Sequence, residues 1–214
     1  MSLAEIWHDL INGLQQTGWL EYIGVFAGIA SVWFSRKENI LVYPIGLINT
    51  IIYVYISIKG SLFGEASVNF YYTVMSIYGW ILWAKKDEQK KLILHITYSN
   101  KKDWLIQSLF FAGFYIGIYA SLVFLKKAFE SNTIPWADAF ASATAYTGMW
   151  LMAKKKIESW YWWIATNIAS IPLYFIKGYV FTSFQYIVLS ILAFMGLVSW
   201  INKTEQKKSL LVAK

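Results

Sequence analysis

The chain alternates long apolar stretches with short polar connections. Seven apolar stretches can be traced, at residues 19–35, 40–58, 66–84, 104–125, 136–153, 160–176 and 181–201. Each is close to the roughly 20 residues that an α-helix needs to cross the hydrocarbon core of a bilayer. Together they use most of the chain and leave no room for a soluble domain. The pattern therefore predicts an all-α integral membrane protein with seven transmembrane helices.

The pattern also repeats along the chain at an offset of 117 to 118 residues. Matched positions include Trp33 with Trp150, Asn49 with Asn167, Gly79 with Gly196, and Trp83 with Trp200. We therefore expect two three-helix repeats, residues 19–84 and 136–201, joined by a loop at 85–103 and a linker helix at 104–125. Because the linker is a single helix, the repeats should run parallel, in a 3+1+3 arrangement about an axis along the membrane normal. The ends would be an interfacial amphipathic segment, residues 1–18, and a tail, residues 202–214.

Charge and composition fix the orientation of this arrangement. Charged residues make up 14% of the chain, against about 25% in soluble domains. With seven alternating spans, 15 of the 19 Lys and Arg residues fall on the side of the C-terminus. The positive-inside rule makes that side cytoplasmic, so we expect the N-terminus outside and the C-terminus inside. The net charge of +7 then reflects topology, and no nucleic-acid partner is expected.

Several classes of protein are excluded by missing residues. The chain has no cysteine, so disulfides, thiolate metal sites and a cysteine nucleophile are ruled out. The two histidines, His8 and His95, lie outside the apolar stretches. A seven-helix retinal receptor would need a lysine inside 181–201, and that stretch has none. No phosphate-binding loop or protease motif is present, so we expect neither an enzyme nor a bound cofactor or metal.

Polar side chains inside the stretches are the candidate functional residues, because each is costly in a bilayer. Asn49 and Asn167 are repeat counterparts near the middle of their spans. Two carboxamides facing each other would offer donors and acceptors to a ligand, or they could simply join helices by hydrogen bonds. Glu21 and Asp138 are counterparts near the outer ends of their spans, as interfacial anchors or as an outer gate.

Aromatic residues lie beside these amides. Trp163, Asn167 and Tyr174 follow one face of a helix at spacings of four and seven, and Asn69 with Tyr72 forms a similar surface. Such surfaces suit a flat polar ring, including a cationic one. The substrate-binding candidates are Asn49, Asn69, Tyr72, Trp160, Trp163, Asn167, Tyr174 and Gln185.

The stretches Tyr43-Pro-Ile-Gly-Leu-Ile-Asn49, Ser76-Ile-Tyr-Gly-Trp80, Glu158-Ser-Trp-Tyr-Trp-Trp163 and Leu173-Tyr174, with Lys177-Gly178, resemble the PnuC family of bacterial vitamin transporters over nearly the whole chain. The resemblance implies a fold like that of the SWEET sugar transporters in the bacterial inner membrane. It also implies facilitated uptake of a vitamin without phosphate groups, nicotinamide riboside first, with trapping by a cytoplasmic vitamin kinase. Family members resemble homotrimers.

The family's binding motif, Trp-x-x-Trp-x-x-x-Asn, corresponds to Trp160, Trp163 and Asn167, and its second-span asparagine to Asn49. Two positions depart from nicotinamide riboside transporters, which usually carry glutamine at Asn69 and at Met149. Thiamine is therefore the alternative substrate, with riboflavin behind it. A channel would need a continuous polar lining, and a non-transporting membrane receptor would need a larger signalling surface than the short C-terminal tail offers.

Overall fold

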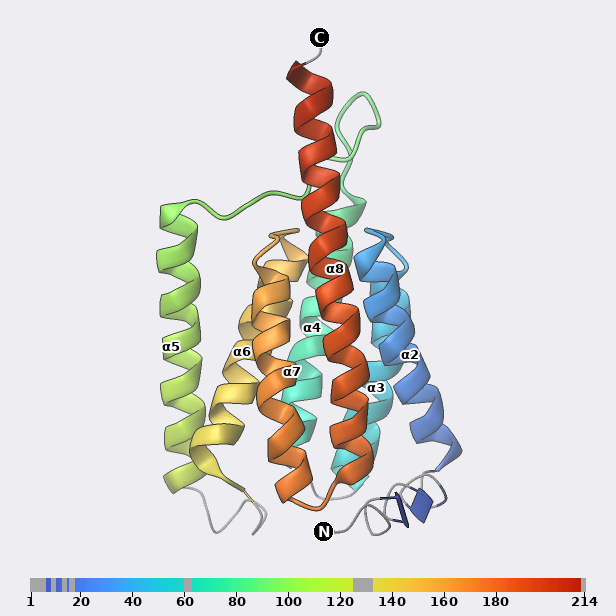
Figure 1. Cartoon of the computed structure of the whole chain (residues 1–214), viewed down its shortest axis with the longest axis vertical. Helices are drawn as coiled ribbons and strands as arrows, with labels where there is room; N and C mark the ends of the chain where they lie inside the picture. Colours follow the sequence, from blue (N-terminus) through green and yellow to red (C-terminus); the bar gives the residue numbers. More distant parts are fainter. Residues whose placement is uncertain are drawn as a thin grey trace.

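The computed structural model describes residues 18–59, 63–124 and 133–212, and five isolated positions before residue 18. Most of the predicted interfacial segment at 1–18 lies outside the described residues. Within them the chain forms seven long helices (Figure 1). These are α2 (Trp19–Arg36), α3 (Val42–Lys59), α4 (Phe63–Ala84), α5 (Lys101–Phe124), α6 (Pro135–Ala153), α7 (Ser159–Ile176) and α8 (Val180–Val212). Each apolar stretch coincides with one helix, so the all-α class is confirmed.

Three of the described helices are long and apolar enough to cross a membrane by length and composition alone: Val42–Lys59, Lys101–Phe124 and Val180–Leu210. The other four carry small and polar residues on the faces that they bury. In α6, for example, Ala143, Thr144, Thr147 and Ala153 are fully buried. Small residues at buried faces let membrane helices approach closely. Because such residues are less hydrophobic, the most tightly packed helices have a lower mean hydropathy.

α8 extends further than the sequence pattern indicates. The apolar stretch ends at residue 201, whereas the helix continues to Val212. Residues 202–212 contain no glycine or proline and include three lysines, one glutamate and one glutamine, which favour helix. Lys203 Nζ also donates to the carbonyl of Lys37 at 2.8 Å, which ties this extension to the end of α2.

Six helices form a closed ring. α2 packs on α3, α3 on α4, α4 on α6, α6 on α7, α7 on α8, and α8 returns to α2. α5 stands outside the ring and packs mainly on α6 (Figure 1). Its Phe114 ring meets Tyr146 of α6 edge-on at 5.0 Å and lies 6.1 Å from Tyr71 of α4. α5 therefore covers the seam between α4 and α6.

Most of the described basic residues gather at one end of the ring, which we call the basic end and which includes residues 36–41, 85–100, 154–158 and 202–212. The loop at 85–100 is fixed there. Ser99 donates its backbone N–H and its hydroxyl to Glu158, at 2.9 and 2.7 Å. Lys156 Nζ donates to Asp103 at 2.9 Å, and this contact, aided by the Asn100 N–H, holds the pKa of Asp103 below its usual value. These contacts seat the loop on the α6–α7 turn.

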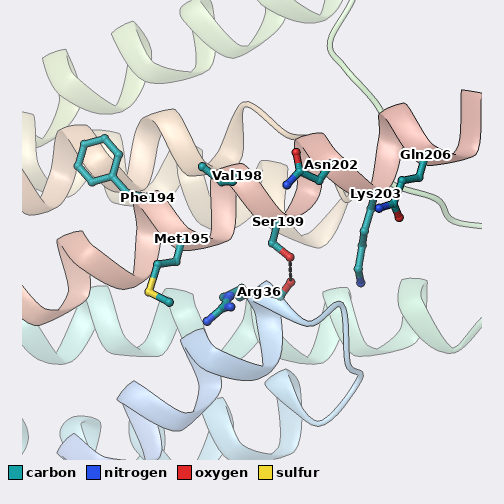
Figure 2. A pocket seen from close by; sticks show the side chains of 8 residues that line it. All are labelled: Arg36, Phe194, Met195, Val198, Ser199, Asn202, Lys203 and Gln206. Carbon is teal, nitrogen blue, oxygen red and sulfur yellow. Dashed lines mark hydrogen bonds between the residues drawn. The ribbon is translucent and has the colours of Figure 1, made fainter. Parts of the chain in front are cut away.

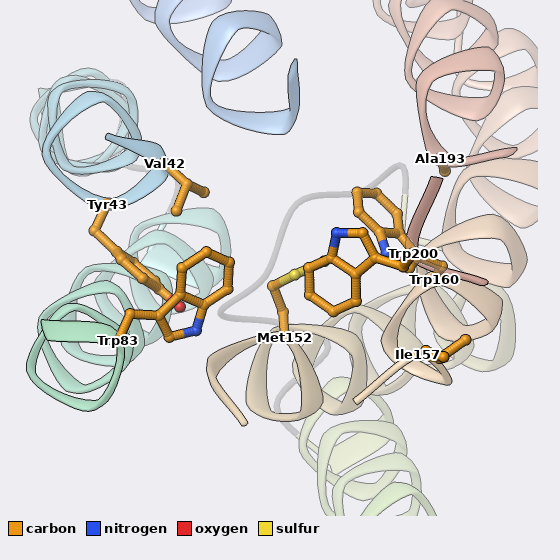
Figure 3. Packing of buried hydrophobic residues seen from close by; sticks show 8 residues of the cluster. All are labelled: Val42, Tyr43, Trp83, Met152, Ile157, Trp160, Ala193 and Trp200. Atoms are coloured by element: carbon orange, nitrogen blue, oxygen red, sulfur yellow. The ribbon is translucent and has the colours of Figure 1, made fainter. Parts of the chain in front are cut away.

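A cluster of large aromatic residues closes the ring near this end (Figure 3). Trp160, Trp200 and Tyr43 are at most 1% exposed. Gly79 and Gly196 make this packing possible, because a Cβ atom at either position would overlap the ring of Tyr43 or Trp160 respectively. These contacts obey the sequence repeat, since all four residues are counterparts at the 117-residue offset.

Candidate functional site

One face of α7 carries Trp163, Asn167, Ser170 and Tyr174, at spacings that place them on a single stripe. The Trp163 ring lies 6.1 Å from Tyr72 of α4. The Tyr174 ring stacks on Tyr186 of α8 at 5.3 Å, with 20° between the ring planes. We call Tyr72, Trp163, Asn167, Tyr174 and Tyr186 the aromatic–amide cluster, and all five are partly or fully buried.

Asn167 lies at the centre of this stripe. Its side chain is 4% exposed, and among the described residues its amide makes no hydrogen bond. A buried amide normally finds partners. The missing partner at the centre of the stripe is consistent with a ligand that supplies it.

Asn49, the repeat counterpart, has a different environment. Its Nδ2 donates to the Gly24 carbonyl of α2 at 2.7 Å, and it lies so close to Gly28 that a Cβ there would approach Nδ2 to 2.8 Å. This hydrogen bond joins α3 to α2, which is the role that the sequence offered as the alternative to ligand binding. No contact among the described residues joins Asn49 to Asn167, so a cavity shared by both stays a prediction.

The other predicted binding residues have mixed surroundings. Asn69 Nδ2 donates to the Glu65 carbonyl of its own helix at 3.0 Å. Trp160 is 1% exposed and packs inside the buried aromatic cluster at the basic end. Gln185 is partly buried next to Tyr186. Substrate contact by any of these three stays a prediction.

Sequence reasoning missed several tyrosines. Tyr146 of α6 stacks on Tyr71 at 4.2 Å and meets Tyr72 edge-on at 6.2 Å, and Tyr71 donates its hydroxyl to the Tyr146 carbonyl at 3.1 Å. Tyr186 completes the cluster from α8. One signal was present, because Tyr186 is the repeat counterpart of Asn69 at the 117-residue offset.

The acidic residues of the opposite end are engaged or near tyrosines. Asp138 pairs with Lys177 at 2.5 Å and accepts the Ile134 N–H at 2.7 Å, so it anchors the start of α6 to the end of α7. Glu21 and Glu65 lie within electrostatic reach of the Tyr53 hydroxyl. The anchoring role therefore describes Asp138 well, and an outer gate formed by Glu21 and Asp138 stays a prediction.

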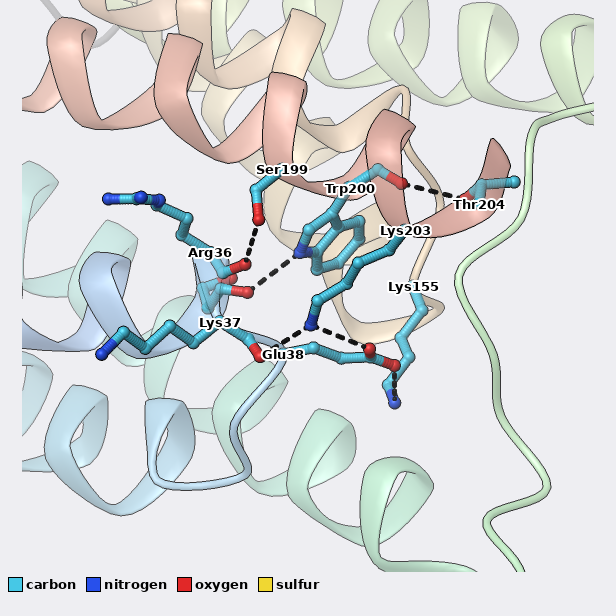
Figure 4. A network of polar contacts seen from close by, with 9 residues as sticks. Arg36, Lys37, Glu38, Lys155, Ser199, Trp200, Lys203 and Thr204 are labelled. Carbon is cyan, nitrogen blue, oxygen red and sulfur yellow. Dashed lines mark hydrogen bonds and ion pairs between the residues drawn. The ribbon is translucent and has the colours of Figure 1, made fainter. Parts of the chain in front are cut away.

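At the basic end, hydrogen bonds join the half formed by α2, α3 and α4 to the half formed by α6, α7 and α8. Trp83 Nε1 donates to the Ala153 carbonyl at 3.2 Å, and Trp200 Nε1 donates to the Ser35 carbonyl at 3.0 Å. The two indole rings lie 6.2 Å apart. These bonds join the two halves of the ring at the basic end; Figure 3 shows both indole rings, and Figure 4 shows the bond that Trp200 donates.

An ion-pair network reinforces this closure (Figure 4). Glu38, after α2, accepts Lys155 Nζ at 2.7 Å and Lys203 Nζ at 3.3 Å. The Lys155 side chain is 1% exposed and also lies over the Trp83 ring at 4.5 Å. Ser199 and Lys203 bind the carbonyls of Arg36 and Lys37, which satisfies the exposed C-terminal end of α2.

The aromatic–amide cluster can bind but offers no groups for bond-making chemistry. Its members are neutral, and the described residues contain no group of three or more His, Cys, Asp or Glu side chains that could hold a metal ion. Aromatic faces can stack on a flat ring, and the Asn167 amide can both donate and accept. This combination is suited to selective, reversible binding of a polar heteroaromatic molecule.

Comparisons with known proteins agree with this site. A family model described as nicotinamide mononucleotide transporter matches residues 18–202. The chain is 25% identical over 211 residues to the nicotinamide riboside transporter PnuC of Escherichia coli (strain K12), covering 89% of this chain and 88% of that protein. It is 21% identical over 183 residues to the riboflavin/roseoflavin transporter RibM of Streptomyces davaonensis, covering 85% and 84%.

A crystal structure of the vitamin B3 transporter PnuC has the same fold. It superposes with a TM-score of 0.69 at 20% sequence identity, over 95% of this chain and 90% of that one. The expectation of a transporter and not an enzyme is confirmed by these matches. The chain belongs to the nicotinamide mononucleotide transporter family and is a membrane transporter of the PnuC type.

Proposed function

We propose that this protein takes up nicotinamide riboside. The observation that carries the proposal is the aromatic–amide cluster, in which a buried Asn167 amide without a protein partner stands between Trp163 and Tyr174. A pyridinium ring is flat and positively charged, so it gains from aromatic faces both by stacking and by cation–π attraction. The Escherichia coli relative is named for this substrate.

The absence of phosphate groups from the substrate follows from charge. The family description names a mononucleotide, and a phosphate would call for Arg or Lys at the site. The described members of the cluster are neutral, and Lys177, at the end of α7, is already paired with Asp138. A nucleoside fits this environment better than a nucleotide does.

Riboflavin is the second candidate, because the RibM relative is named for it. Thiamine, also a cationic heteroaromatic molecule, is the third. All three would stack on the same aromatic faces. The protein would therefore discriminate among them through the polar groups of the substrate that hydrogen-bond to Asn167. Hydrogen-bonding sites discriminate strongly when a substrate lacks the matching group.

We infer that transport is facilitated diffusion by alternating access, in a SWEET-like 3+1+3 arrangement. Support comes from the ring order, in which α2–α3–α4 and α6–α7–α8 meet at two equivalent seams and α5 stands outside. The closure at Trp83 and Trp200 would open to release the substrate, while Glu21 and Asp138 would lie at the outer gate. No buried carboxylate belongs to the cluster, so no proton-binding group couples transport there.

The orientation that we propose puts the basic end in the cytoplasm and the N-terminus outside, in a bacterial inner membrane. The distribution of 15 of 19 basic residues supports it, and the loop at 85–100 and the C-terminal end of α8 lie at the same end (Figure 1). A cytoplasmic vitamin kinase would then phosphorylate the substrate, whose new charge prevents its return. We also propose that the protein assembles as a homotrimer.

The test is direct binding to the purified protein by titration calorimetry, with nicotinamide riboside, nicotinamide mononucleotide, riboflavin and thiamine as ligands. Trp163→Ala should weaken binding by about 1–3 kcal/mol, the usual loss when an aromatic stacking partner is removed. Tyr161→Ala is the matched control, because that ring is 43% exposed and adjacent in sequence. Tighter binding of the mononucleotide than of the riboside would contradict the proposal.

A further inference from the structure

A cavity of about 620 Å³ lies at the basic end, between the end of α2 and α8 (Figure 2). None of its lining residues belongs to the aromatic–amide cluster. The lining residues are Arg36, Phe194, Met195, Val198, Ser199, Asn202, Lys203 and Gln206. Phe194, Met195 and Val198 lie toward one end of the cavity with the Arg36 guanidinium beside Met195, and Asn202, Lys203 and Gln206 lie toward the other end.

Arg36 supplies an unused donor to this cavity. Its Nη1 is buried and has no hydrogen-bond partner, although the guanidinium rests over the Trp33 ring at 4.6 Å. An unsatisfied buried donor costs free energy, most of all when it is charged. The structure therefore has a buried guanidinium nitrogen that no described residue uses as a donor.

The surrounding charges select an anion. Asn202 and Gln206 add amides, and no acidic residue lines the cavity, whereas the Lys203 ammonium at its far end is already paired with Glu38. The nearest carboxylate in the network, Glu38, is engaged by Lys155 and Lys203. A guanidinium fork with neighbouring donors matches a phosphate group, which offers several acceptor oxygens.

The apolar half of the cavity indicates the source of the phosphate. Phe194, Met195 and Val198 are 50%, 39% and 56% exposed on α8, at the side nearer the middle of the helix. A soluble phosphate ion has no use for such a surface, whereas the glycerol and acyl chains of a phospholipid would cover it. Basic pockets between transmembrane helices are typical sites for anionic lipid headgroups.

The surroundings of the corresponding tryptophan in the second repeat differ. Trp150, the counterpart of Trp33, carries Lys154 Nζ over its ring at 3.9 Å, but Phe110 of α5 stacks on Trp150 at 4.7 Å. α5 thus occupies the surface that is open beside Trp33. Lys154 is consequently a matched control, with a similar cation–aromatic contact at the same end of the molecule.

We propose that this cavity binds a phosphate-bearing anion, and that its source is the headgroup of an anionic phospholipid in the leaflet at the basic end. The lipid would sit in the seam between α2 and α8, with its phosphate on Arg36 and its acyl chains along Phe194 and Val198. This site is separate from substrate binding and does not depend on which vitamin is transported.

The test uses the purified full-length protein in mixed micelles, with bound lipid measured by native mass spectrometry. Arg36→Gln should reduce retained phosphatidylglycerol at least about tenfold, the size of one lost charged contact, whereas Lys154→Gln should leave it unchanged. Phosphatidylcholine should be retained less than phosphatidylglycerol by the unmodified protein. Thermal unfolding of each variant confirms that it is folded, and Arg36→Lys supplies a charge-conserving variant expected to retain an intermediate amount.

Three outcomes would overturn the proposal. Equal loss of phosphatidylglycerol in Arg36→Gln and Lys154→Gln would reduce the effect to general surface charge. Displacement of the lipid by millimolar inorganic phosphate would assign the cavity to a soluble anion. A change of oligomeric state in Arg36→Gln that is independent of lipid would make the cavity a contact between copies of this chain.

Discussion

Asn49 and Asn167 occupy equivalent places in the repeat, yet their amides have different partners. Asn49 binds the Gly24 carbonyl, whereas the Asn167 amide has no partner among the described residues. Removing each amide should therefore affect a different property of the protein. Comparing the two variants separates ligand binding from helix packing.

We expect Asn167→Ala to weaken binding of nicotinamide riboside by more than about 1 kcal/mol, because a polar group of the ligand loses its partner in a buried site. Asn49→Ala should instead lower thermal stability, with a smaller effect on affinity. Calorimetric titration and thermal unfolding of both variants test this. Unchanged affinity in a well-folded Asn167→Ala protein would return that amide to a packing role.

A second residue-scale prediction concerns the closest helix approach. Gly196→Ala should destabilise the protein by about 1–3 kcal/mol, because the added methyl group overlaps the Trp160 ring and overpacks a filled core. Gly113→Ala is the control, since nothing lies within 4 Å of that position on α5 and alanine favours helix. Thermal unfolding in detergent measures both, and equal midpoints would contradict the tight packing.

At the scale of elements, α2 and α6 are each followed by a turn of the same conformation. Glu38 and Lys155 follow these helices with φ angles of 60° and 52°, the left-handed conformation that commonly ends a helix. They are repeat counterparts, and divergence has given them opposite charges. The two turns therefore pair with each other directly, at 2.7 Å.

Exchanging the charges of Glu38 and Lys155 should restore the stability that each single substitution lowers. Glu38→Lys and Lys155→Glu should each destabilise the closed ring, and the double variant should recover at least about 0.5 kcal/mol of coupling in a double-mutant cycle. The same exchange at Glu205 and Lys208, an ion pair whose side chains are 57% and 61% exposed, should show almost no coupling. Additive effects at Glu38 and Lys155 would mean that the ion pair does not hold the turns together.

The apolar pattern located the seven long helices of the described residues, α2 to α8, because the bilayer demands runs of fixed length and the repeat supplied a second copy for comparison. The stripe of Trp163, Asn167 and Tyr174 followed from helical spacing. The pattern could not place Tyr146 and Tyr186, since their roles depend on how α6 and α8 rotate within the ring. It also missed the polar end of α8, which is helical by propensity and by its contacts with α2.

The site belongs to one repeat more than to the other. Trp163 lies against Gly148, whose Cβ would meet the indole at 3.3 Å, whereas the counterparts of these residues are Gly46 and Ser31. The large and small positions are therefore not copied, and a single indole enters the cluster. Comparing the sequences of the two repeats reveals this difference, but only the packing shows that it places one indole in the cluster.

For the whole molecule, we expect transport without ion coupling. Labelled nicotinamide riboside should equilibrate across proteoliposome membranes driven by its own gradient alone, because the aromatic–amide cluster contains no carboxylate or histidine to carry a proton. Imposed proton or sodium gradients should leave the final level unchanged. Accumulation above the external concentration in vesicles without a kinase would sink the uniport mechanism.

The placement of α5 gives the two seams of the ring unequal freedom. Phe114 clasps α4 and α6 together, while no described helix covers the junction of α8 with α2. We therefore expect the α4–α6 seam to stay closed and act as the hinge, and the α2–α8 seam to open. Because the chain has no cysteine, spin labels can be introduced at chosen pairs without background. Substrate should change the distance between Asn39→Cys and Gln206→Cys more than that between Lys85→Cys and Lys154→Cys, and equal changes would mean that the halves separate evenly.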